Sequence, residues 1–349
     1  MTAPAAPVAK THYAVLDGLR GVAALIVVAF HVLEAHAGGD AHRQIINHGY
    51  LAVDFFFLLS GFVIWLTWGA RLHDRGMGAA PLFWRKRVAR IWPLHALMLG
   101  FAAAIALALA TTGRHDPAFP LAELPLHLLL VQNWGITDAL RWNDPAWSIS
   151  CEAAAYILFP LLACAADWRR LPTVLLVAVA VALLAVLHVV MRDQPSLGSD
   201  IPHYGLTRCL TEFGCGTVVA ALFLRRPSFL WPATILLLCC AAWVAGAPET
   251  AVVPAAFAAL LLTLALTAGR AGNPLETRAI HYLGDISYAT YLSHFLLWKA
   301  FKLAFVHQPG PVPPAAIAAY LGIVFAASVA LYHLWERPAQ RWVNAASLP

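Results

Sequence analysis

The chain is built from long, nearly uninterrupted apolar runs, and this feature limits its possible folds more than any other. A helix needs about 20 residues to cross the roughly 30 Å hydrocarbon core of a bilayer. Ten runs of this kind lie near residues 13–36, 50–69, 90–112, 147–166, 172–191, 204–224, 229–246, 250–269, 281–305 and 315–336. Only 12% of the 349 residues are charged, against about 25% in a soluble domain. The sequence therefore predicts an all-α fold, a polytopic bundle of about ten transmembrane helices, and excludes a soluble enzyme.

The distribution of lysine and arginine predicts the orientation of this bundle. If the N-terminus is cytoplasmic, 15 of the 23 Lys and Arg residues fall on the cytoplasmic side and 4 in outer loops. Cytoplasmic loops of membrane proteins carry such an excess, so we expect both termini in the cytoplasm. The same excess accounts for the formal net charge of +5 without a nucleic-acid partner.

The organisation of the chain is predicted to be simple, with one membrane domain over residues 1–349 and no appended soluble domain. The first run also resembles a secretory signal peptide, because Lys10 precedes it and Ala35-His36-Ala37 follows it. Asp17 is unusual in such a segment, and we expect the run to be retained. Residues 121–134 predict a shorter interfacial or re-entrant segment. No cysteine lies at a spacing typical of a zinc site, so we expect no metal.

Asp17, Arg20 and His31 are ionisable residues of the first run, where each is costly and therefore a functional candidate. Eleven residues separate Arg20 from His31, which on a helix is roughly 20° past three full turns and about 16 Å along the axis. The two side chains are thus predicted on one face, with Asp17 one turn before Arg20. The alternative is that His31 is a packing histidine bonded to a carbonyl.

Arg87 and Arg90 form the second candidate group, at the predicted inner end of the third run. They are i,i+3 neighbours on a helix, and two guanidinium groups on one face are suited to binding phosphates. The spacing explains simple anchoring at the membrane surface equally well.

Glu152 begins the third group, just inside the predicted outer boundary at a depth comparable to that of His31. A carboxylate there can orient an imidazole, although a glutamate at the water-exposed rim is the alternative. Arg208 and Glu212, one turn apart in the sixth run, are expected to form a structural ion pair. Asp54, at the outer start of the second run, remains undecided.

Six segments in order resemble the acyltransferase-3 family of integral membrane acyltransferases, and they span essentially the whole chain. The segments are Tyr13-Ala-Val-Leu-Asp-Gly-Leu-Arg-Gly-Val-Ala-Ala with Phe30-His31, Val53-Asp-Phe-Phe-Phe-Leu-Leu-Ser-Gly-Phe62, Arg87-Val-Ala-Arg90 with Pro93, Trp147-Ser-Ile-Ser-Cys-Glu152 with Tyr156, Leu283-Gly-Asp-Ile-Ser-Tyr-Ala-Thr-Tyr-Leu-Ser-His294, and Glu336-Arg-Pro338. The resemblance implies about ten spans and transfer of an acyl group from cytoplasmic acyl-coenzyme A to a sugar hydroxyl or similar acceptor.

The resemblance also implies roles for particular residues. His31 matches the family's presumed catalytic residue, Arg20 the arginine before it, and the pair Arg87 and Arg90 the motif implicated in handling coenzyme A. One departure is that family members often read Glu-Glu-Gln-Phe where this chain has Glu152-Ala-Ala-Ala-Tyr156. A mechanism that uses two carboxylates is therefore in doubt here.

The residues and the resemblance lead to one expected function. We expect an O-acyltransferase with no permanently bound cofactor that takes an acyl group, expected to be acetyl, from acyl-coenzyme A. The acceptor is expected to be a hydroxyl of an extracytoplasmic or lipid-linked carbohydrate, and the location the bacterial inner (cell) membrane. The candidate catalytic residues are His31, Glu152, Arg20 and Asp17, and the candidate donor-binding residues are Arg87 and Arg90.

Two other classes of protein remain as alternatives. A transporter or flippase for a lipid-linked sugar would also line a polar path with Arg, His and Glu, whereas a structural membrane subunit leaves Arg20 and His31 unexplained. Within the enzyme hypothesis, His31 either removes a proton from the acceptor or first carries the acyl group itself. The sequence assigns no role to His294 and no oligomeric state.

Overall fold

All regular secondary structure in the described part of the chain is helical, which confirms the predicted all-α class. The computed structural model describes residues 14–33, 47–270, 273–306 and 312–345. The α-helices are α1 (Ala14–Leu33), α3 (Ala52–Ile64), α4 (Ala70–Arg75), α5 (Ala80–Thr111), α6 (Leu124–Leu128), α7 (Ala146–Ala165), α8 (Thr173–Val190), α9 (Ile201–Leu224), α10 (Leu230–Val244), α11 (Glu249–Thr267), α12 (Arg278–Phe305), α13 (Pro314–Leu331) and α14 (Arg337–Ala345). Lys10, Tyr13, Arg43 and Ala35-His36-Ala37 lie outside the described residues.

The long helices confirm a multi-pass membrane protein. Seven segments of the described chain are long and apolar enough to cross a membrane, and one of them, Gly49–Thr111, contains both α3 and α5. Two further helices coincide with predicted spans but are not among the seven: α10 has only 15 residues, and α12 carries charged residues such as Asp285 and Lys299. The number of ten crossings therefore stays a prediction.

Helix α5 differs most from its predicted run, because it begins at Ala80 rather than near residue 90. Pro81 at its first turn suits a helix start, and the basic residues that follow are good helix formers. The helix thus continues beyond the apolar run instead of ending with it. As a consequence, Arg87 and Arg90 stand on the body of a helix and are held by a regular backbone.

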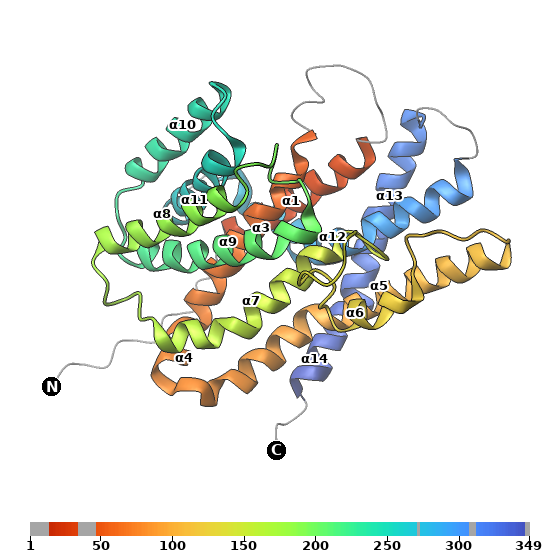
Figure 1. Cartoon of the computed structure of the whole chain (residues 1–349), viewed down its shortest axis with the longest axis horizontal. Helices are drawn as coiled ribbons and strands as arrows, with labels where there is room; N and C mark the ends of the chain where they lie inside the picture. Colours follow the sequence, from red (N-terminus) through yellow and green to blue (C-terminus); the bar gives the residue numbers. More distant parts are fainter. Residues whose placement is uncertain (1–13, 34–46, 271–272, 307–311, 346–349) are drawn as a thin grey trace.

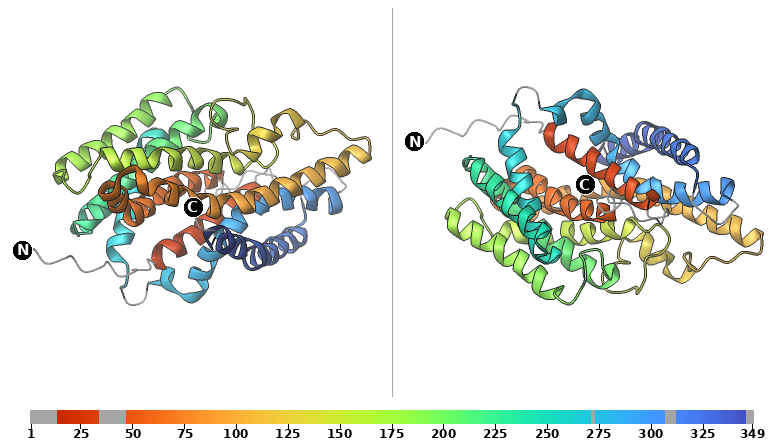
Figure 2. Two further views of the ribbon diagram at one scale, coloured as in Figure 1. Left: turned by 90° about the horizontal axis from the view of Figure 1, so that it is seen from below. Right: turned by 90° about the horizontal axis from the view of Figure 1, so that it is seen from above.

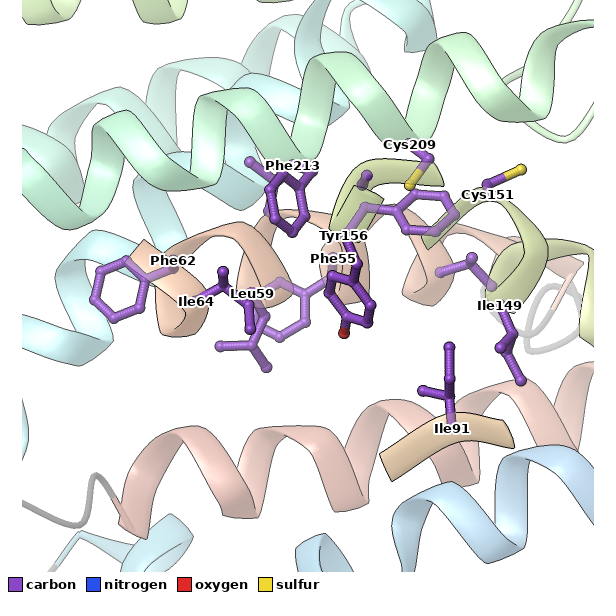
Figure 3. Packing of buried hydrophobic residues seen from close by; sticks show 14 of the residues in the cluster. Phe55, Leu59, Phe62, Ile64, Ile91, Ile149, Cys151, Tyr156, Cys209 and Phe213 are labelled. Atoms are coloured by element: carbon purple, nitrogen blue, oxygen red, sulfur yellow. The ribbon is translucent and has the colours of Figure 1, made fainter. Parts of the chain in front are cut away.

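Two close helix pairs organise the bundle (Figure 1). Helices α1 and α12 lie side by side (Figure 2), and at Gly284 of α12 the carbonyl of Asp17 occupies the space that a Cβ would need. Helices α3 and α9 approach as closely, because Gly61 lies against the backbone of Phe213. Figure 3 shows the rings of Phe213 and Tyr156, whose centroids are 6.2 Å apart, in the apolar cluster beside α3.

The α3–α9 pair also contains a buried ion pair that corrects one sequence-based expectation. Arg208 donates two hydrogen bonds to Asp54 Oδ1, at 2.7 and 3.0 Å, and a third to Oδ2 at 2.8 Å. The expected pairing of Arg208 with Glu212 is therefore wrong, because Arg208 pairs with Asp54 while Glu212 is buried beside the pair. Both side chains share one face of α9, as predicted, but that face is turned to α3, where Asp54 meets the guanidinium bidentately.

Two helical segments are wound more widely than an α-helix. The π-helical turn Trp65–Gly69 leads from α3 into α4, and a second, Tyr332–Glu336, leads from α13 into α14. Helix α14 packs against α5, and the side chain of Glu336 is buried at this junction. The second turn therefore places a carboxylate against the helix that carries Arg87 and Arg90.

The long connection between α5 and α7 contains charged groups whose ionisation is altered by their surroundings. Lys299 Nζ lies 2.7 Å from Asp116. Although partial burial acts in the opposite direction, this hydrogen bond lowers the pKa of Asp116. Burial raises the pKa of Asp144, directly before α7, to about 6. The short helix α6, in the segment predicted to be interfacial, belongs to the same connection.

The predicted orientation gives a direct test of this arrangement. We expect a reporter fused within the connection of α5 and α7, near Asp138, to be active only outside the cytoplasm, because most basic residues lie in the opposite loops. A reporter fused after α14 should be found in the cytoplasm. Alkaline phosphatase and green fluorescent protein fusions, compared at equal expression, measure the two locations. A cytoplasmic connection would contradict the predicted orientation and outward delivery.

Candidate active site

A cavity of about 160 Å³ lies within the bundle between α1, α3, α5, α7 and α12. Helix α3 supplies an apolar wall of Val53, Phe56, Phe57, Leu59, Val63 and Ile64. The polar part of the lining consists of Arg20, Ser60, Arg87, Arg90, Ser148, Glu152, Tyr156, Ser287, Tyr288 and Tyr291. Five helices thus bring polar groups that are up to 271 positions apart in the sequence to one cavity.

The three arginines in this lining differ in how their charge is balanced. Arg90 forms an ion pair with Glu336, whose side chain is 1% exposed. Arg20 lies 3.7 Å from Asp17 one turn earlier in α1. Arg87 has no carboxylate within ion-pair distance among the described residues, and its Nε makes no hydrogen bond there. Among the described residues, Arg87 is thus the lining arginine without a direct ion pair, although Glu152 lines the same cavity. Its guanidinium group can therefore meet an anionic ligand.

Two aromatic rings hold this guanidinium in place. The Arg87 guanidinium carbon lies 5.9 Å from the ring centre of Phe83 and 5.8 Å from that of Tyr156. Such cation–π contacts orient an arginine without neutralising its charge. Arg87 is thus fixed in position while its donors remain available to a ligand.

Glu152 also lines the cavity and is held by two hydroxyl groups. The Tyr156 hydroxyl donates to its carboxylate at 2.5 Å, and the Ser60 hydroxyl donates to the same oxygen. The hydroxyl oxygens of Ser60 and Tyr156 also lie 3.1 Å apart, within hydrogen-bond distance. Glu152 was expected to orient the imidazole of His31. Its hydrogen bonds instead hold its carboxylate in the cavity that the arginines line.

His31 lies near the end of α1 and forms a second polar centre. Its Nδ1 lies 3.0 Å from the carbonyl oxygen of Val27 and 3.2 Å from Nε2 of His294 on α12. His31 is not part of the cavity lining, but Tyr291, which is, has its ring centre 6.1 Å from that of His294. The Tyr291 hydroxyl also lies 2.7 Å from that of Ser148. Tyr291 thus joins the cavity to the histidine pair.

The structure brings most of the sequence-predicted residues together. Arg20, Arg87, Arg90 and Glu152 line one cavity, and Asp17 stands beside Arg20 and 3.7 Å from His281 of α12. The described residues contain no group of three or more His, Cys, Asp or Glu side chains arranged to hold a metal ion.

Sequence reasoning gave no role to several residues that the structure places here. Ser60 and Tyr291 lie in two of the family segments, but they carry no charge, so their place in an apolar run does not mark them as polar lining. Glu336 also lies in a family segment, and the need of a buried arginine for a carboxylate could have identified it. A buried arginine requires a carboxylate, and Glu336 is the acidic residue at the end of the last apolar run.

Comparisons with known proteins point to the same family as the sequence segments. The model of the acyltransferase-3 family, described as an acyltransferase domain, matches residues 13–333. Acyltransferase MdmB of Streptomyces mycarofaciens is 32% identical over 93% of this chain and 91% of its own length. Protein 2 in the picA locus of Rhizobium radiobacter is 33% identical over 50% of this chain and 93% of its own length. A putative O-acetyltransferase of Staphylococcus aureus (strain COL) is 26% identical over 42% of this chain and 24% of its own length. No solved structure matches significantly.

Proposed function

Because this chain belongs to the acyltransferase-3 family and is a membrane O-acyltransferase, we propose that it transfers an acyl group, in the first place acetyl, from cytoplasmic acyl-coenzyme A to a carbohydrate. The acceptor is a hydroxyl of an extracytoplasmic or lipid-linked glycan. The protein acts in the cell membrane. The single observation that carries the proposal is the cavity lined by Arg20, Arg87 and Arg90, in which Arg87 has no direct ion pair among the described residues.

The charge and size of the cavity support acyl-coenzyme A as the donor. Acyl-coenzyme A carries several phosphate charges, and guanidinium groups bind phosphate bidentately. The cavity of about 160 Å³ is smaller than the roughly 300–1,000 Å³ of sites that enclose drug-sized ligands. We therefore place the thioester and the pantetheine arm inside it, with the diphosphate at Arg87 and Arg90 and the rest of the nucleotide outside, toward the cytoplasm.

The transfer step uses His31 as the base. The neutral imidazole takes the proton of the acceptor hydroxyl while the hydroxyl oxygen bonds to the acyl carbon. The carbon–sulfur bond then breaks, and the coenzyme A thiolate leaves and accepts the proton from the His31 imidazolium. In the alternative route, His31 attacks the thioester first, and the acyl-imidazole then passes the acyl group to the hydroxyl. Because Tyr291 borders both the cavity and the histidine pair, donor and acceptor meet beside it.

A labelling experiment tests this function directly. Inverted membrane vesicles from a deletion strain of the source organism, with and without the restored protein, are incubated with acetyl-coenzyme A labelled in the acetyl group. We expect label in the carbohydrate fraction only when the protein is present, and its release by mild alkali because an ester is formed. Equal labelling with and without the protein would contradict the proposed donor and acceptor.

Arg87 should determine the affinity for the donor. The Arg87→Lys variant keeps the charge but loses the bidentate fork, so we expect the KM for acetyl-coenzyme A to rise by about tenfold, which corresponds to roughly 1.4 kcal/mol. Arg85→Lys is the matched control, since Arg85 lies two positions away and does not line the cavity. Release of the coenzyme A thiol measures both. Unchanged KM in both variants would mean that Arg87 only anchors α5.

A further inference from the structure

His294, to which the sequence assigns no role, has a ring whose protonation is determined by its neighbours. The residue is fully buried, and its Nδ1 lies 2.6 Å from the carbonyl oxygen of Tyr291 and 3.2 Å from that of Thr290. Carbonyl oxygens only accept hydrogen bonds, so Nδ1 carries the hydrogen. Among the described residues no carboxylate lies within ion-pair distance of this ring, and a charged imidazole in an apolar interior is costly. The ring is therefore neutral, with its lone pair on Nε2.

This assignment determines the hydrogen bond that joins the two histidines. His294 Nε2 lies 3.2 Å from His31 Nδ1. Since His294 Nε2 accepts, His31 Nδ1 must donate. The carbonyl oxygen of Val27, 3.0 Å from the same nitrogen, also accepts and requires the same hydrogen. Neutral His31 thus carries its hydrogen on Nδ1 and its lone pair on Nε2.

We propose that His294 is a positioning residue for acyl transfer, which holds His31 in the tautomer whose Nε2 can accept a proton. This role rests on the proposed function, in which His31 is the base. It is analogous to that of the carboxylate that orients the histidine in a Ser-His-Asp triad, but here the orienting group is a neutral ring. The backbone of α12 supplies the orientation in turn, through the carbonyl groups of Thr290 and Tyr291.

The pair also acts during the reaction. When His31 Nε2 takes the proton of the acceptor hydroxyl, His31 becomes an imidazolium and its Nδ1–H still points at the lone pair of His294. A hydrogen bond from a charged donor is stronger than one from a neutral donor, so the interaction grows as the proton moves. His294 keeps its own proton throughout, and the proton on His31 leaves with the coenzyme A thiol.

Two substitutions separate this role from simple packing. His294→Gln places a side-chain carbonyl near the position of Nε2 and can still accept from His31, whereas His294→Phe fills the space without an acceptor. We expect His294→Phe to lower kcat by about tenfold to a hundredfold, less than the roughly 10⁴-fold loss when a triad carboxylate is replaced. The KM for acetyl-coenzyme A should stay unchanged, and His294→Gln should recover most of the loss.

A double variant shows whether His294 acts through His31. In the His31→Ala background, His294→Phe should cause no additional loss in the vesicle labelling assay, because residues that act as a unit are not additive. Equal losses for His294→Gln and His294→Phe, or a full additional loss in the double variant, would overturn the proposal. A rise in KM with unchanged kcat would overturn it as well.

The tautomers can be measured without any transfer assay. Solid-state nuclear magnetic resonance of the ¹⁵N-histidine-labelled protein in bilayers, with the two rings assigned by His31→Ala and His294→Gln, reports which ring nitrogens carry hydrogen. We expect hydrogen on Nδ1 of both residues and none on either Nε2. Hydrogen on Nε2 of His31 with a bare Nδ1 would overturn the inference whether or not the protein transfers acetyl groups. A correct tautomer pair in a protein that transfers no label would instead remove the proposed function, and with it the role of His294.

Discussion

Replacement of His31 by alanine is expected to lower acyl transfer by about 10²–10⁴-fold, the range that loss of a general acid–base group typically costs. The protein should still insert and fold, because the side chain lies at the end of α1 and is only half-buried. The measurement is labelled acetyl ester in carbohydrate per unit of inserted protein. A variant that retains a tenth of the wild-type activity would show that His31 is only a packing residue.

A matched control exists elsewhere in the bundle. His188 of α8 is also half-buried, and its ring hydrogen-bonds to Thr250 at 2.8 Å, but it lies outside the cavity lining. His188→Ala should therefore keep normal transfer at equal insertion. A comparable loss in both variants would indicate a general effect of removing a membrane-embedded histidine instead of a catalytic one.

Replacement of Arg208 by glutamine is expected to destabilise the fold strongly while leaving the lining of the cavity chemically intact. The guanidinium side chain is 1% exposed and its partner Asp54 is fully buried. Removing one member of a buried pair leaves an uncompensated charge, which typically costs about 3–5 kcal/mol. Thermal unfolding of the purified protein in detergent, compared with the wild type at the same pH, measures the loss.

The double variant Asp54→Asn with Arg208→Gln separates the charge from the packing. Both groups are then neutral, so most of the lost stability should return, since the large penalty comes from the unpaired charge. If the single Arg208→Gln variant unfolds at the wild-type temperature, the ion pair contributes little to the α3–α9 contact. If the double variant is no more stable than the single one, the shape of the side chains matters more than their charge.

The sequence predicted the positions of the helices well because a membrane helix is encoded locally, by its own apolar length. The exception is α5, where the backbone continues through Arg85, Lys86 and Arg87 beyond the apolar run. Basic residues favour a helix as much as apolar ones do, and hydropathy alone records only the part in hydrocarbon.

The contacts between helices were much harder to predict. Arg90 meets Glu336, 246 positions away, and His31 meets His294, 263 positions away. Which residues face each other depends on the rotation of each helix and on its neighbours, and neither can be read from one run. Charge balance was a usable guide only where a partner had to exist. It indicated that Arg208 needs a carboxylate. The partner in the structure is Asp54 and not Glu212, which is nearer in the sequence.

The π-helical turn Tyr332–Glu336 has a consequence for how the cavity can vary. Such a turn amounts to one extra residue within a regular helix, so it rotates everything after it by about 100° relative to α13. Glu336, the last residue of this turn, forms the ion pair with Arg90. We expect that deleting a single residue from this turn would restore a regular helix and turn the Glu336 carboxylate away from Arg90. Arg90 would then lose its ion-pair partner. The charge balance of Arg90, which lines the cavity, thus depends on a turn that does not itself line it.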